Sequence, residues 1–274
     1  MAHPKDLLER HGLQPKQSLG QNFLFDDNIL ARIVEAAQVT PEDAVLEIGA
    51  GVGALTHHLA RAAGRVVAVE LDDRLIPLLH HEMARTDNVT VVHGDILELS
   101  PDDWFGDAAY KVVANVPYYI TGAILKHLLS GRSKPRVVVM TVQKEVAQRV
   151  TAGPGEMSLL AVSVQFYGEP RLVSDIKAGA FWPRPEVNSA ILRIDLYDEP
   201  RLPLAEEAAL FRVVKAGFAQ KRKQLQKNLR SLGLPRDEID AALARAGIAG
   251  TRRAETLSVA EWVRLYRVLY GLEL

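Results

Sequence analysis

Short apolar runs alternate with helix-like stretches over residues 44–141. The runs cover residues 44–48, 66–69, 89–92, 112–114 and 137–140. Runs as apolar as these, separated by helices, are typical of parallel strands that are buried on both faces. The pattern therefore predicts a doubly wound α/β domain. Two more strand-like stretches, 171–173 and 190–194, follow a helical segment at 159–166 and extend the predicted sheet.

The spacing of apolar residues changes around residues 198–203, a polar stretch that contains two prolines. Beyond it the apolar positions recur at helical intervals, first at Leu210, Val213, Val214 and Phe218 and later over 257–269. The sequence thus predicts two domains, an α/β domain over residues 1–200 and a small helical domain over residues 201–274.

Charge is distributed unevenly between these two parts. Residues 201–274 hold 14 Lys or Arg and 8 Asp or Glu, a net charge of +6, so residues 1–200 carry −7 of the total of −1. The segment 215–230 holds six basic residues and no acidic one. Such a run is typical of a surface that binds phosphate backbones, and equally of a solvated helix face.

Composition removes several classes of protein. The chain has no cysteine, which excludes disulfides, thiolate metal sites and cysteine nucleophiles. The histidines at 57–58 and 80–81 are adjacent pairs, which do not share a helix face, and no metal site is expected. No apolar run approaches the roughly 20 residues that span a membrane. Residues 1–6 do not resemble a signal peptide, so we expect a soluble, cytoplasmic protein.

Polar residues and glycines follow the first three predicted strands, where a parallel sheet binds its ligands. Gly49, Gly51 and Gly53 form a loop that lets backbone amides approach a ligand, but Ala54 breaks the G-x-G-x-x-G pattern of dehydrogenases. Glu70 ends the second strand, where an acid can bind both ribose hydroxyls, and Asp95, after the third, can accept from an adenine amine. Each acid by itself also fits a helix cap or a solvated turn.

These residues resemble the class I methyltransferases that depend on S-adenosylmethionine. In that family the E-x-G-x-G-x-G loop lies against the methionine part of the cofactor, the acid after strand two holds the ribose, and the acid after strand three meets the adenine. The resemblance assigns these roles to Gly49, Glu70 and Asp95. It also implies a Rossmann-like sheet of seven strands whose last strand is antiparallel, with helices on both faces.

The stretch Asn115-Val116-Pro117-Tyr118 follows the fourth strand. Val116 is pushed towards extended geometry by Pro117, which has no N–H to continue a ladder. The Asn115 side-chain oxygen and a nearby main-chain carbonyl then offer two acceptors for an exocyclic amine. Holding both hydrogens of an adenine N6 turns its electron pair towards a methyl donor. Tyr118 can stack on the base; the alternative is a β-turn whose tyrosines pack in the core.

Three motifs resemble the rRNA adenine-N6 dimethyltransferases. The tetrapeptide at 115–118 matches their N-[IVL]-P-Y form, and residues 18–24 match an S-L-G-Q-N-F-L signature in which Asn22 and Leu24 contact the cofactor. Residues 181–189 match the F-x-P-x-P-x-V-x-S loop that borders the target pocket and begins at Phe181. The resemblance implies that Asn115 serves both the cofactor and the target base.

Two branches of this group differ in their RNA. One dimethylates two adjacent adenines in the 3′-terminal hairpin loop of 16S rRNA (the KsgA/RsmA type), and the other methylates 23S rRNA (the Erm type). Residues 218–229 resemble the F-x-x-R-R-K-x-L-x-x-x-L signature of the first branch, with Lys221, Arg222 and Lys223 at its basic positions. Lys221 replaces an arginine, and Glu156-Met157 replaces the usual Tyr-Gly. We expect a monomer that acts on 16S rRNA in the 30S subunit or its precursor.

Three alternatives remain beside this interpretation. The first is an Erm-type enzyme of 23S rRNA. The second is an assembly factor that has kept the fold and lost catalysis, against which the intact Gly49, Glu70, Asp95 and Asn115 argue. The third, a DNA adenine methyltransferase, is weaker because the sequence shows no separate target-recognition domain.

Overall fold

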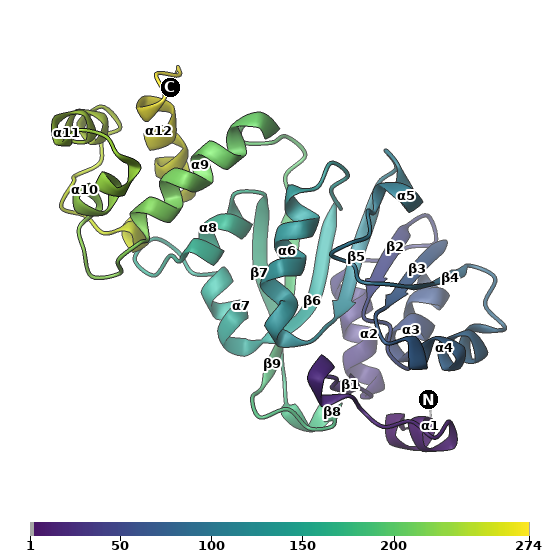
Figure 1. The fold of residues 1–274 in the computed structure, drawn as a ribbon. Helices are drawn as coiled ribbons and strands as arrows, with labels where there is room; N and C mark the ends of the chain where they lie inside the picture. Colours follow the sequence, from purple (N-terminus) through teal and green to yellow (C-terminus); the bar gives the residue numbers. More distant parts are fainter. Residues whose placement is uncertain (1–2, 274) are drawn as a thin grey trace. The chain divides into compact units, whose positions relative to one another are not determined.

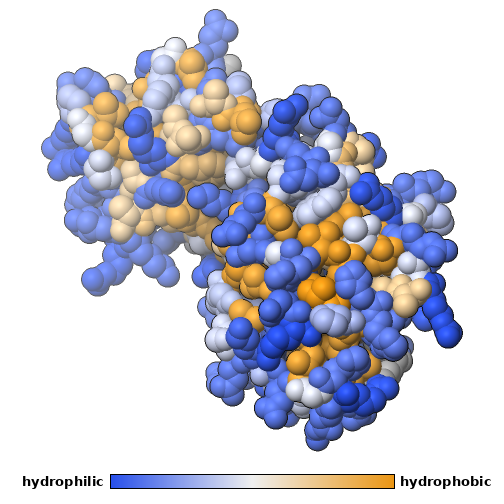
Figure 2. All heavy atoms as spheres, turned by 45° about the vertical axis from the view of Figure 1, so that its right-hand side comes forward, coloured by the Kyte–Doolittle hydropathy of each residue, from blue (hydrophilic) through white to orange (hydrophobic). Residues whose placement is uncertain are grey.

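The computed structural model describes residues 3–273, which form two compact units (Figure 1). The first, called here the sheet unit, comprises the chain up to Ala147 together with Pro170–Leu196. The second, called the helical unit, comprises Gln148–Glu169 and the chain from Tyr197 onward. Hydrophilic residues cover most of the face drawn in Figure 2, and within residues 3–273 no helix combines the length and apolar character needed to cross a membrane.

Seven strands form one sheet in the order β4-β3-β2-β5-β6-β9-β7. Their bounds are β2 (Ala44–Ile48), β3 (Arg65–Glu70), β4 (Val89–His93), β5 (Tyr110–Asn115), β6 (Val137–Gln143), β7 (Gly168–Ile176) and β9 (Ser189–Leu196). Strands β2 to β6 are parallel, and β9 runs antiparallel to β6. The α/β fold with seven strands and an antiparallel last strand, expected from the sequence, is confirmed.

Helices flank the sheet on both faces. The sheet unit contains α1 (Pro4–Arg10), α2 (Asp27–Ala36), α3 (Ala54–Ala62), α4 (Ile76–Met83), α5 (Asp102–Phe105), α6 (Thr121–Ser130), the start of α7 (Lys144–Val150), and the short strands β1 (Phe23–Leu24) and β8 (Phe181–Trp182). Helix α2 begins at an N-cap, Asp26, whose carboxylate accepts from two backbone amides, and it buries Ile33 against the sheet. Figure 1 shows α6 in front of the sheet and α2 behind it.

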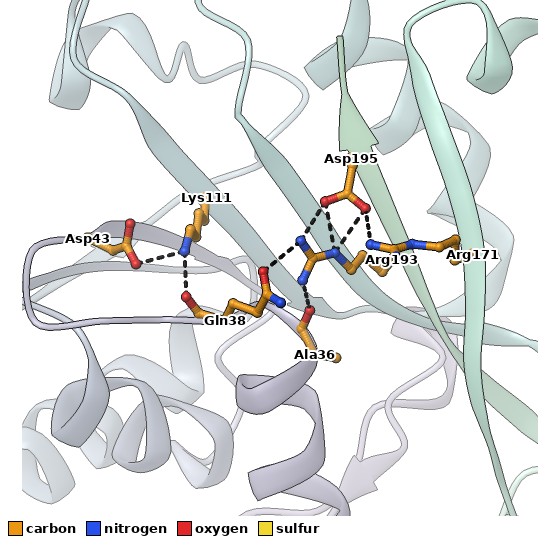
Figure 3. A network of polar contacts seen from close by, with 7 residues as sticks. All are labelled: Ala36, Gln38, Asp43, Lys111, Arg171, Arg193 and Asp195. Atoms are coloured by element: carbon orange, nitrogen blue, oxygen red, sulfur yellow. Dashed lines mark hydrogen bonds and ion pairs between the residues drawn. The ribbon is translucent and has the colours of Figure 1, made fainter. Parts of the chain in front are cut away.

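The amino ends of the strands carry a network of charged side chains (Figure 3). Lys111, on β5, lies 2.7 Å from Asp43 and donates to the carbonyl of Gln38 at 2.6 Å. Arg193, on β9, binds Asp195 at 2.5 Å and also donates to the Gln38 side chain. Gln38 has a positive φ of 49°, which is unfavourable by about 1–2 kcal/mol for a residue with a Cβ. The two cations hold this turn in place.

The helical unit is built around Trp262. Its helices are α8 (Leu159–Gln165), α9 (Leu204–Gly217), α10 (Leu225–Asn228), α11 (Arg236–Arg245) and α12 (Val259–Leu269). Trp262 is fully buried, and a Cβ at Gly217 would come within 2.3 Å of its ring, so α9 and α12 require glycine there. Asn228 fastens α10 to the end of α9 by donating to the carbonyl of Gly217 at 2.6 Å. The helical carboxyl-terminal region expected from the sequence is present.

One segment lies in a different unit from the domain expected for it. The sequence placed residues 148–169 in the α/β domain, whereas their apolar side chains Met157, Val162 and Phe166 belong to the buried core of the helical unit. A helical pattern shows which side chains need burial but not which partner buries them. The change of pattern near residue 200 lies close to Tyr197, where the chain enters the helical unit for the second time.

Candidate active site

A glycine loop follows β2 and leads into α3. Gly49, Gly51 and Gly53 all have positive φ, a conformation that side chains with a Cβ rarely adopt. At Gly49 space is also limiting, because a Cβ there would lie 3.0 Å from the carbonyl oxygen of Asn115. The loop therefore lies directly against the end of β5. This contact brings the glycine motif and the Asn115 motif to one place.

The Glu70 carboxylate ties the end of β3 to this loop. Its two oxygens accept from the backbone amides of Gly51 at 2.7 Å and Asp72 at 2.8 Å. Burial raises the pKa of Glu70, and the two amides oppose this shift because they stabilise the charged form. Each carboxylate oxygen can still accept a second hydrogen bond, since it has two lone pairs. Glu70 is thus held in position with acceptor capacity left for a ligand.

Asp95 lies in the loop after β4 and is half-buried. Its Oδ1 atom accepts from the backbone amide of Leu97 at 2.9 Å, which fixes the carboxylate at the start of the turn. From the sequence alone, a position in a helix cap or a turn is the alternative to a binding role for Asp95. The structure contains the turn and also places Asp95 in the lining of the cavity described below.

The end of β5 and the residues after it are held by two side chains from other strands. The hydroxyl of Thr141, on β6, donates to Asn115 Oδ1 at 2.5 Å. The Tyr118 hydroxyl lies 2.6 Å from the hydroxyl of Ser189, and burial raises the pKa of this phenol. Tyr118 is half-buried, whereas Tyr119 beside it is 68% exposed. The Tyr118 side chain is therefore held by β9 through Ser189, whereas most of the Tyr119 side chain is exposed.

The amino-terminal motif closes over the same region. Strand β1 pairs antiparallel with β8, which joins the motif at 18–24 to the motif that begins at Phe181. Gln21 donates to Asp72 Oδ2 at 2.8 Å. Arg74 also binds Asp72 and, as the main cause, lowers the pKa of Asp72 to about 2. The motif is thereby attached to the loop that carries Glu70.

A single cavity in the sheet unit brings these motifs together. Its lining includes all the residues that the sequence analysis proposed for the cofactor and for catalysis: Asn22, Leu24, Gly49, Glu70, Asp95, Asn115, Val116, Pro117, Tyr118 and Phe181. Apolar side chains such as Ile48, Val69 and Ile96 fill the spaces between them. A mostly apolar cavity with a few fixed polar groups is typical of a small-molecule site.

The basic residues proposed for RNA binding lie in the helical unit. Lys221, Arg222 and Lys223 are exposed and form the turn between α9 and α10, so they are not part of a helix face. Among residues 3–273, no three His, Asp or Glu side chains lie close enough together to hold a metal ion.

Some contacts of the site have no local signal in the sequence. Gln21 lies within a recognised motif, yet its partner Asp72 is 51 residues away. Thr141 is a polar residue within an apolar strand, and its partner Asn115 is identified only by the strand register. Ser189 ends the motif at 181–189 and acquires a role only through Tyr118.

Comparison with known proteins gives consistent matches over nearly the whole chain. The family model described as "Ribosomal RNA adenine dimethylase" matches residues 12–270. A ribosomal RNA small subunit methyltransferase A of Dehalococcoides mccartyi is 44% identical over 97% of this chain and 92% of its own. The protein of the same name from Moorella thermoacetica is 43% identical over 96% of this chain and 95% of its own.

Solved structures share the fold. The 23S rRNA methyltransferase ErmE is 32% identical with a TM-score of 0.73, over 91% of this chain and 100% of that one. A dimethyladenosine transferase from Plasmodium falciparum, 24% identical over 89% of this chain and 95% of that one, has a TM-score of 0.77.

Proposed function

Because the chain belongs to the ribosomal RNA adenine dimethylase family, we propose that it dimethylates N6 of two adjacent adenines in the 3′-terminal hairpin loop of 16S rRNA, late in small-subunit assembly. The observation that carries this proposal is the cavity shared by the glycine loop, Glu70, Asp95 and the stretch 115–118. A cofactor site and an amine-binding motif meet there.

The residues at the strand ends fit S-adenosylmethionine, which supplies the methyl group. The glycine loop has positive φ angles, and Gly49 and Gly51 line the cavity with their backbone. Glu70 keeps acceptor capacity for ribose hydroxyls, and Asp95 faces the same cavity for the adenine amine. Asn22 and Leu24 line the side formed by the amino-terminal motif.

The stretch 115–118 suits the amine of the target base. Asn115 is the last residue of β5, so the Val116 carbonyl lies beyond the ladder that Pro117 ends. The Asn115 side-chain oxygen and this carbonyl can each accept one N6 hydrogen, which orients the nitrogen electron pair towards the methyl group. Tyr118, held by Ser189, can stack on the base, and Phe181 lines the same cavity. Stacking contributes about 1–3 kcal/mol per base.

The deciding experiment is transfer of labelled methyl groups to unmethylated 30S subunits and, in parallel, to unmethylated 23S rRNA. We expect two adjacent dimethyladenosines in 16S rRNA and no label in 23S rRNA. Label confined to 23S rRNA would instead indicate a 23S rRNA methyltransferase, the activity named for ErmE, whose fold is similar. Cofactor binding without transfer to either RNA would favour an assembly factor that has lost catalysis.

The exposed basic turn supports docking on rRNA phosphates. Neutralising Lys221, Arg222 and Lys223 to glutamine should weaken binding to 30S subunits and reduce the slope of log affinity against log salt by about 2–3. Phosphate contacts position an RNA while the pocket specifies it, so the identity of the methylated base should not change. A matched control neutralises three exposed cations elsewhere in the helical unit, Arg236 and Arg245 of α11 and Arg253 beyond it. If the salt slope of the variant with three substitutions at 221–223 were unchanged, these residues would be an ordinary solvated surface and not a phosphate-binding one.

A further inference from the structure

A buried hydroxyl holds the side chain of Asn115. Thr141 is the register partner of Asn115 on the neighbouring parallel strand β6, and its Oγ1 atom donates to Asn115 Oδ1 at 2.5 Å. Thr141 has no exposure to solvent. A hydroxyl buried without a hydrogen bond is unfavourable, so this bond also satisfies Thr141 itself.

The strand around Thr141 gives no packing reason for a hydroxyl. The strand reads Val-Val-Val-Met-Thr-Val-Gln, and the residues on either side, Met140 and Val142, are apolar and fully buried. Valine has the same branched shape as threonine and would pack equally well. The polar atom at this position is therefore accounted for by Asn115.

The hydrogen bond decides which atom of the Asn115 amide is presented for binding. Rotation about the last torsion of an asparagine is soft, and a half-turn exchanges the oxygen and the NH₂ group. An NH₂ group facing the target amine would set donor against donor. The amide oxygen has two lone pairs, and Thr141 occupies one of them. The other remains to accept a hydrogen from the amine.

We propose that Thr141 is a positioning residue for methyl transfer, whose hydroxyl fixes the Asn115 amide oxygen as the acceptor for the target amine. This inference rests on the proposed function of Asn115. Both residues belong to strands in the middle of the sheet, so their separation is set by strand register rather than by a loop. An acceptor on such a support keeps the alignment that transfer requires.

The test compares Thr141→Val, which keeps the shape and removes the hydroxyl, with Thr141→Ser, which keeps the hydroxyl. In methyl transfer to unmethylated 30S subunits, Thr141→Val should lower kcat by roughly 10-fold to 100-fold, as misplacement of a reacting group does. KM for the subunit, the Kd of S-adenosylhomocysteine and the melting temperature should stay close to those of the parent. Thr141→Ser should restore most of kcat.

A matched control is Thr121→Val. Thr121 is also buried, and its hydroxyl has no hydrogen-bond partner among the described residues, so kcat should not change. Equal kcat in Thr141→Val and the parent would overturn the inference, as would a Thr141→Ser variant as slow as Thr141→Val, because packing would then be the cause. A parent inactive on both RNAs would overturn the proposed function and this role together, whereas an active parent separates the two.

Discussion

The two edges of the central sheet treat charged side chains in opposite ways. At the carboxyl ends of the strands, Glu70 and Asp95 accept hydrogen bonds from backbone amides of the loops that follow the strands. At the amino ends, Lys111 is bound to Asp43, and Arg193 is bound to Asp195 (Figure 3). Among the described residues, Glu70 and Asp95 have no neutralising cation, although Asp72 beside Glu70 is bound to Arg74, whereas Asp43 and Asp195 at the second edge are neutralised.

This difference distinguishes the carboxyl ends of the parallel strands, called here the binding edge, from their amino ends, called here the supporting edge. A backbone amide orients a carboxylate while leaving its charge and further lone pairs for a ligand. An arginine or lysine partner uses that capacity within the protein. Charged residues occur at both ends of the strands in the sequence, so their presence alone does not locate a site. Their partners in the folded chain do.

The largest expected effect contrasts the two ends of strand β5. Asn115→Ala, at the carboxyl end, should lower methyl transfer to 30S subunits by about 1,000-fold, at the upper end of the effect of removing one group that stabilises a transition state. Cofactor binding should persist in part. Lys111→Met, four residues earlier, should leave kcat within about twofold and lower stability instead, since Asp43 loses its cation. Full activity of Asn115→Ala would remove the proposed mechanism.

A large loss of stability without loss of function is expected from Arg193→Met. The side chain of Arg193 is 10% exposed and binds Asp195, the Gln38 side chain and the carbonyl of Ala36. Removing it leaves the Ala36 carbonyl and the Gln38 side chain without this donor and Asp195 with the exposed Arg171 as its remaining cation, so the free energy of unfolding should fall by about 2–4 kcal/mol. Urea unfolding measures the loss, and kcat at a temperature well below the transition should match that of the parent. A fall in kcat with unchanged stability would contradict the assignment of this edge to support.

Much of the binding edge could be predicted from the sequence because it depends on local signals. Apolar runs located the strands, and parallel strands bring their ends together, so Glu70, Asp95 and Asn115 were expected at one edge. The structure confirms the sheet and places these side chains around one cavity. Their roles towards cofactor and RNA stay predictions.

The contacts between distant segments could not be predicted. The bond from Thr141 to Asn115 depends on the register of β5 and β6, and a shift by one residue would point Thr141 to the other face. The attachment of Gln21 to Asp72 and the pairing of β1 with β8 likewise depend on tertiary packing. Residues 148–169 needed an apolar partner, and the sequence did not show that the helical unit supplies it.

A smaller effect is expected from Glu47, a carboxyl at the binding edge with neither an amide nor a cation as partner. Its oxygens have no hydrogen-bond partner among the described residues. Burial raises the pKa of Glu47 from 4.5 to about 8, the nearby Glu70 carboxylate adds to the rise, and the neighbouring Thr56 hydroxyl opposes it without reaching good hydrogen-bond geometry. The folded protein thus keeps a proton that the unfolded chain releases near pH 4.5.

Stability contributed by Glu47 is therefore complete below pH 4.5 and is lost as the pH rises towards 8. Between pH 6 and 7 the free energy of unfolding should fall by about 1 kcal/mol on this account. The Glu47→Gln variant has no titrating carboxyl at this position, so its free energy of unfolding should depend less on pH over this range. Parallel urea titrations of the two proteins measure this effect. Both proteins contain the same histidines, so the contribution of the histidines cancels when one is subtracted from the other. Identical slopes would mean that Glu47 is already ionised in the folded protein.

The smallest effect is expected from the exposed member of the supporting network. Arg171 lies 2.5 Å from Asp195, but its side chain is 56% exposed, against 10% for Arg193 on the other side of the same carboxylate. Solvent and salt screen an exposed pair, so Arg171→Gln should change the free energy of unfolding by less than about 0.5 kcal/mol. The small change should disappear in 0.5 M salt, whereas the effect of Arg193→Met should persist there. A loss as large as that of Arg193→Met would mean that charge neutralisation at Asp195, rather than burial of its partner, stabilises this edge.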